Sequence, residues 1–195
     1  MMKRCLLATL VLLCPATVFA GSISGIVSSA NDGLKDKQKA VVIWVEGLAA
    51  DSVPDEKATV SQTGLQFHPR VITVVAGQTI DFPNDDDVAH NVFSLSKAKQ
   101  FKLGIYPKGQ SRSVKFDKPG VIDLFCSIHR HMHAVVVVTP TAHSATAEIG
   151  KPFRIEDVPA GEYVVKVWNS AHKTTSHKIV VTETGDAAFD VTLSK

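Results

Sequence analysis

The feature that most constrains the fold is a succession of short runs, typical of strands, in which apolar residues are continuous or alternate with polar ones, separated by turn residues. These runs cover 40–45, 65–67, 71–75, 78–82, 91–95, 114–116, 121–125 and 134–139. Turn signals at His68-Pro69, Ala76-Gly77 and Pro119-Gly120 interrupt them. No segment of the sequence sustains the 3.6-residue apolar period of an amphipathic helix. We therefore predict an all-β protein built as a sandwich or barrel.

Between the last two runs lies a loop that is rich in metal-binding side chains. It reads Phe125-Cys126-Ser127-Ile128-His129-Arg130-His131-Met132, with the spacing C-x2-H-x2-M. A second imidazole, His90, lies upstream next to Asn91. Two His, one Cys and a weak Met are the ligand set of a mononuclear blue-copper site. The spacing, with strands expected on both sides of the loop, predicts a metal site here.

Other readings of the nearby polar residues stay open or are disfavoured. His131 is the one rival to His129 as the loop imidazole ligand, and otherwise His131 and His133 are expected to face solvent. The run Asp85-Asp86-Asp87 lacks the spacing of a calcium-binding EF-hand and is interpreted as a solvated turn.

The first 20 residues have the features of a secretory leader. Lys3 and Arg4 precede an apolar stretch that ends at Phe19, and Val18-Phe19-Ala20 is a small-residue cleavage site. The stretch is shorter than the roughly 20 residues that span a bilayer, so we expect cleavage after Ala20, export to the periplasm and no membrane anchor.

Removal of the leader changes the cysteine count and the charge. Cys5 and Cys14 leave with it, so Cys126 becomes the single thiol of an exported protein, where an even number would suggest disulfides. Metal ligation explains a lone thiol. The formal charge falls from +2 to 0 with the loss of Lys3 and Arg4, which gives no basic excess for binding nucleic acid.

The two ends of the chain share a second resemblance. The segments 150–155 (GKPFRI) and 158–163 (VPAGEY) resemble the second half of a carboxypeptidase-regulatory-like (transthyretin-like) β-sandwich. Segments 22–27 (SISGIV) and 40–45 (AVVIWV) look like its first half. One hypothesis is a discontinuous outer domain, 21–58 plus 140–195, with a copper domain at 59–139 inserted in it. The alternative is that the N-terminal strands extend the copper domain.

Residues 59–139 resemble the cupredoxins, on the ligand loop and on the opening strands 65–80 (LQFHPRVITVVAGQTI). The loop spacing is that of amicyanin, whereas plastocyanin has a longer gap between His and Met. The whole chain looks like the exported methylamine-utilisation proteins. The resemblance implies a Greek-key β-sandwich and one type 1 copper ion. Its implied ligands are His90, Cys126, His129 and Met132.

The resemblance also assigns roles to the residues around the ligands. Asn91 and Ser127 would form the second shell, with Asn91 tying its strand to the Cys loop. His129 would be the electron port, bordered by Ile128 and Arg130. Arg130 stands where the family often has Pro, which leaves the loop shape and the nearby surface charge open.

These features favour an electron carrier that is not an enzyme. It would shuttle single electrons in the periplasm from a dehydrogenase, such as a quinoprotein, to a c-type cytochrome or oxidase. A multicopper oxidase or nitrite reductase would need a His beside the Cys, but Phe125 and Ser127 flank Cys126. The alternatives are a copper-binding or delivery protein without electron transfer, and a cell-envelope scaffold module.

Overall fold

The protein is made of strands and loops, as the sequence predicts. The computed structural model describes residues 20–31, 33–35, 38–48, 53–183 and 185–194, and all its named elements are strands. The expected leader lies outside these residues, apart from Ala20. Among the described residues, no helix has the length and apolar character needed to cross a membrane.

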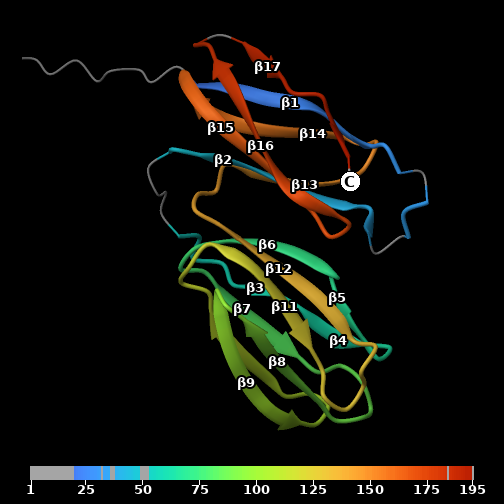
Figure 1. Cartoon of the computed structure of the whole chain (residues 1–195). Coiled ribbons are helices and arrows are strands. Elements are labelled where there is room, and N and C mark those ends of the chain that lie inside the picture. Colours follow the sequence, from blue (N-terminus) through green and yellow to red (C-terminus); the bar gives the residue numbers. More distant parts are fainter. Residues whose placement is uncertain (1–19, 32, 36–37, 49–52, 184, 195) are drawn as a thin grey trace, which may run out of the picture.

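The middle of the chain forms the inner sandwich, shown in the lower half of Figure 1. Its strands are β3 (Ala58–Thr59), β4 (Ser61–Thr63), β5 (Gln66–His68), β6 (Val71–Val75), β7 (Thr79–Pro83), β8 (His90–Ser96), β9 (Lys99–Tyr106), β10 (Ser111–Lys115), β11 (Gly120–Phe125) and β12 (His133–Thr139). They form a sheet in the order β6-β12-β11-β8-β9, a sheet in the order β10-β7-β3, and the pair β4-β5. One apolar core joins the two larger sheets and includes Phe82, Val92, Leu124, Cys126 and Met132.

The two ends of the chain form the outer sandwich, in the upper half of Figure 1. Its strands are β1 (Ala20–Ser29), β2 (Ala40–Glu46), β13 (Ser144–Glu148), β14 (Pro152–Pro159), β15 (Gly161–Asn169), β16 (His172–Val181), β17 (Asp186–Ala188) and β18 (Val191–Leu193). One sheet has the order β14-β1-β17, with β18 also paired to β1, and the other has the order β13-β2-β15-β16. A shared core, separate from that of the inner sandwich, lies between them.

The N-terminal strands pair with strands of the C-terminal tail. Ile23 of β1 lies opposite Ile155 of β14, and Val42 of β2 lies opposite Trp168 of β15. We propose from this pairing that β1 and β2 complete one discontinuous outer domain, into which the inner sandwich is inserted. Its kinship with carboxypeptidase-regulatory-like domains stays a prediction.

A third apolar cluster joins the two sandwiches. Val42 and Trp168 from the outer sandwich pack with Val135 and Val137 of β12, and Thr73 and Thr146 share a hydrogen bond of 2.8 Å between their hydroxyls. Alternate residues of β12 face the inner core instead. A strand buried on both faces has an unbroken apolar sequence, which explains the run 134–138.

Several strands were not predicted from the sequence. The eight-residue β9 is one, because Lys99, Lys102 and Gly104 interrupt its apolar residues. Its fully buried last residue, Tyr106, belongs to the inner core, and the alternating Phe101 and Leu103 are partly buried against that core. Polar composition likewise concealed β13 and the short β3 and β4.

The proposed outer domain predicts a stability effect at Gly25 of β1. A Cβ at this position would collide with the backbone carbonyl of Phe189. We expect Gly25→Ala to cost about 1–3 kcal/mol of unfolding free energy, as overpacking does. Urea unfolding measures the cost, with Gly33→Ala as the control, because its Cβ would meet only Asn31 Oδ1 at 3.5 Å. Equal stability of the two variants would contradict the close packing of β1 on the tail.

Candidate metal centre

The ends of three neighbouring strands bring the predicted site residues together. β11 pairs with β8 on one side and β12 on the other, so Phe125 lies opposite both Phe93 and His133. His90 begins β8, and Cys126 follows the last residue of β11. The loop 126–132 closes the hairpin between β11 and β12. Sheet pairing therefore brings His90 next to a loop that is remote in the sequence.

Three donor side chains converge at this point. The nearest ligand atoms of His90, Cys126 and His129 all lie within 4.8 Å of one another. Cys126 Sγ lies 3.9 Å from His90 Nδ1, and the Nδ1 atoms of the two His are 3.0 Å apart. His90 and Cys126 are buried, whereas His129 is partly exposed. In the part of the chain that the structure describes, this is the one cluster of three or more His, Cys, Asp or Glu side chains with this geometry.

Met132 follows His129 by three residues in the sequence and is also buried. Its side chain is 1% exposed and belongs to the same apolar core as Cys126. Its amide donates a hydrogen bond of 2.9 Å to the carbonyl of His129, which tightens the end of the loop. The role of this thioether as a weak axial donor stays a prediction.

The structure brings His129, and not His131, into the cluster. His131 is exposed, and its Nε2 lies 3.0 Å from the carbonyl oxygen of Leu65. His133 is half-exposed, with Nε2 2.8 Å from Asp123 Oδ1. Both rings are thus held by oxygen atoms outside the cluster.

The donor chemistry fits copper. One thiol sulfur is a soft donor, and two imidazole nitrogens suit copper and zinc alike. Because their Nδ1 atoms face each other at 3.0 Å, the two His can present both lone pairs to one cation. The sulfur favours Cu(I), and the imidazoles also accommodate Cu(II).

Asn91 links the two segments that carry these donors. Its Oδ1 accepts hydrogen bonds from Ser127 N at 2.9 Å and from Ser127 Oγ at 3.1 Å. The resemblance to the cupredoxins predicts this link between the His90 strand and the Cys loop. The second-shell role of the pair around a metal stays a prediction.

The carboxylate of Asp86 contacts the ring nitrogen of His90 that points away from Cys126. Asp86 Oδ2 lies 2.8 Å from His90 Nε2, so the expectation of a solvated turn is wrong for Asp86. Its carboxylate also accepts hydrogen bonds from Gly64 N and Leu65 N at 2.6 and 2.9 Å. Burial raises the pKa of Asp86, but hydrogen bonds from Leu65, His90 and Gly64 outweigh it and hold that pKa below its usual value. The one signal in the sequence for this contact is that Asp86 lies four residues before His90.

The surface beside His129 combines apolar and charged side chains. Ile128 is 45% exposed, and Arg130 is also exposed. Of the three clustered donors, His90 and Cys126 are buried and His129 alone is partly exposed.

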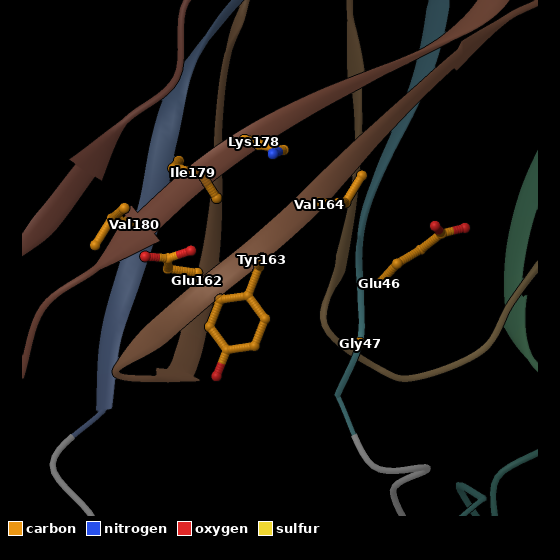
Figure 2. A pocket seen from close by; sticks show the side chains of 8 residues that line it. All are labelled: Glu46, Gly47, Glu162, Tyr163, Val164, Lys178, Ile179 and Val180. Carbon is orange, nitrogen blue, oxygen red and sulfur yellow. The ribbon is translucent and has the colours of Figure 1, made fainter.

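A hollow on the outer sandwich is a separate feature. Figure 2 shows Tyr163, Glu162 and Val164 of β15 with Glu46 and Gly47 at the end of β2. Lys178, Ile179 and Val180 of β16 complete this pocket of about 590 Å³. Its lining belongs to the outer sandwich, away from the cluster of His90, Cys126 and His129.

Comparison with known proteins agrees with this geometry. Residues 54–139 match the model of the copper binding proteins of the plastocyanin/azurin family. Amicyanin of Paracoccus versutus is 26% identical over 105 residues, which are 52% of this chain and 80% of that protein. Chloroplastic plastocyanin of Physcomitrium patens is 29% identical over 125 residues, which are 57% of this chain and 74% of that protein.

Solved structures of cupredoxins match with low TM-scores. A Cu(I) structure of an amicyanin variant has a TM-score of 0.41 at 23% identity and covers 50% of this chain and 98% of its own. A purple cupredoxin from Nitrosopumilus maritimus has a TM-score of 0.39 at 23% identity and covers 43% of this chain and 100% of its own.

The family match covers every strand of the inner sandwich and includes the three converging donors. Residues 54–139 are therefore a cupredoxin domain, a copper-binding domain of the plastocyanin/azurin family.

Proposed function

We propose that the protein is a periplasmic carrier of single electrons and not an enzyme. Its one type 1 copper ion would be held by His90, Cys126, His129 and Met132. The donor would be a dehydrogenase, such as a quinoprotein, and the acceptor a c-type cytochrome or oxidase. The observation that carries the proposal is the convergence of His90 Nδ1, Cys126 Sγ and His129 Nδ1 within a family of copper-binding proteins.

The chain's own residues supply the conditions for fast electron transfer. Copper, when bound, supplies a one-electron couple between Cu(II) and Cu(I). His90 and Cys126 are fixed by strand ends and by burial, so these donors need little rearrangement between the two states. The Asn91–Ser127 hydrogen bonds restrain the same segments. Such restraint holds the donors in position before any metal binds.

His129 is the donor that a partner protein can approach. Its ring is partly exposed, while His90 and Cys126 are covered. The exposed Ile128 lies one residue before it, and Arg130 lies one residue after it. An apolar surface with one adjacent charge suits brief docking, because weak redox encounters use small interfaces. We therefore propose His129 as the electron port, with Ile128 and Arg130 at its border.

The optical spectrum of the copper-loaded protein tests this function. We expect intense visible absorption from thiolate-to-copper charge transfer, which one electron per copper bleaches and reoxidation restores. Cys126→Ala should abolish the band, because it removes the sulfur donor. Ser127→Ala is the matched control and should keep the colour, since the Ser127 N–H still reaches Asn91.

Two results would contradict the proposal in different ways. A Cys126→Ala variant that keeps the colour would show that the ligand assignment is wrong. A wild-type protein that binds copper but cannot be cycled would favour a copper-binding or delivery role.

A paired substitution tests which loop imidazole is the ligand. We expect His129→Gly to lose or shift the visible band and added imidazole to restore it, because the partly exposed position leaves a gap that solvent can reach. His131→Ala should keep the band, since His131 Nε2 is held at Leu65 O. Spectra of both variants with and without imidazole give the answer. The opposite pattern would assign His131 as the ligand.

A further inference from the structure

The carboxylate of Asp86 has no role in the ligand set, yet it lies against a proposed ligand. Asp86 Oδ2 is 2.8 Å from Nε2 of His90, whose side chain is fully buried, and the Asp86 side chain is 14% exposed. An ionised carboxylate accepts hydrogen bonds and has no proton to donate. Nε2 of His90 therefore carries the proton. Nδ1, the atom that faces Cys126 and His129, is left with its lone pair.

The position of Asp86 is itself fixed by other hydrogen bonds. Its amide donates to Oδ1 of the fully buried Asn84 at 3.0 Å, and Asn84 Nδ2 donates to the carbonyls of Val88 and Tyr106. The Asp86 carboxylate also accepts from the amides of Gly64 and Leu65. Asp86 is thus held in place before it meets His90.

The turn at Gly64 and Leu65, between β4 and β5, also contacts the ligand loop. Leu65 donates its amide to Asp86 and receives His131 Nε2 on its carbonyl at 3.0 Å. Leu65 has a φ of +58°, an uncommon conformation for a residue with a side chain. The turn between β4 and β5 therefore connects the outer side of His90 with the loop that carries Cys126 and His129.

We propose that Asp86 is the positioning residue of the metal centre, which fixes the tautomer and ring orientation of His90 and strengthens it as a donor to Cu(II). This inference rests on the proposed copper site. A carboxylate on the outer nitrogen of a ligating imidazole raises the basicity of the inner nitrogen. The stronger donor stabilises Cu(II) relative to Cu(I), so Asp86 lowers the reduction potential.

The first experiment uses the metal-free protein and does not depend on copper. Nitrogen NMR of the His side chains should show His90 protonated at Nε2 and unprotonated at Nδ1. Asp86→Asn should populate the other tautomer, because the amide group can donate to Nε2. Asp86→Glu, which keeps a carboxylate acceptor, should restore the wild-type tautomer at least in part.

The second experiment measures copper binding and potential. We expect Asp86→Ala to weaken Cu(II) affinity about 10- to 100-fold, as loss of an outer-shell partner does. Asp86→Asn should raise the reduction potential. Asp87→Asn is the matched control, because it removes the same charge one residue away from an exposed side chain that pairs with Lys108. Its potential should shift less than that of Asp86→Asn.

The outcomes separate this inference from the proposed function. Wild-type His90 protonated at Nδ1 would overturn the positioning role, whether or not any variant folds. Equal potential shifts in Asp86→Asn and Asp87→Asn would also overturn it and leave Asp86 as a clamp for the turn. A wild-type protein that binds no copper would overturn the proposed function, while the tautomer result would still stand.

Discussion

The pairing of β11 with both β8 and β12 is the constraint on which the site depends. It places His90 beside Cys126, although 36 residues separate them in the sequence. The ordering cost of bringing these segments together is met by the sandwich core, in which Val92, Leu124 and Met132 are buried. The sheet pairing and this core bring the donors together, and the part-buried hydrogen bonds of Asn91 and Asp86 hold the adjoining segments.

The outer sandwich extends this restraint to the back of the ligand hairpin. Val135 and Val137 of β12 pack against Val42 and Trp168, while Val136 and Val138 pack into the inner core. The strand that follows Met132 is thus covered on both faces. Loops are the mobile parts of most folds, but this loop is anchored at both ends on buried strands. The outer sandwich therefore adds to the rigidity of the ligand hairpin.

Local patterns made much of this predictable from the sequence. The C-x2-H-x2-M spacing indicated the ligand loop because all its members lie within seven residues. Asn91 drew attention to His90, and the unbroken apolar run 134–138 reflects the two buried faces of β12. The remainder depended on tertiary contacts. Spacing alone could not separate His129 from His131, since the difference is that Leu65 O holds His131. Asp86 resembled a surface residue in the sequence. The amides that hold its carboxylate beside His90 belong to Gly64 and Leu65, which are remote in the chain.

X-ray absorption at the copper edge, recorded on oxidised and reduced protein, tests the central claim most directly. A scaffold that holds His90, Cys126 and His129 in place predicts one sulfur and two imidazole nitrogens at short distance in both states, with nearly unchanged bond lengths. Loss of an imidazole on reduction, or a coordination shell without the short sulfur, would contradict a site that the strands have already shaped.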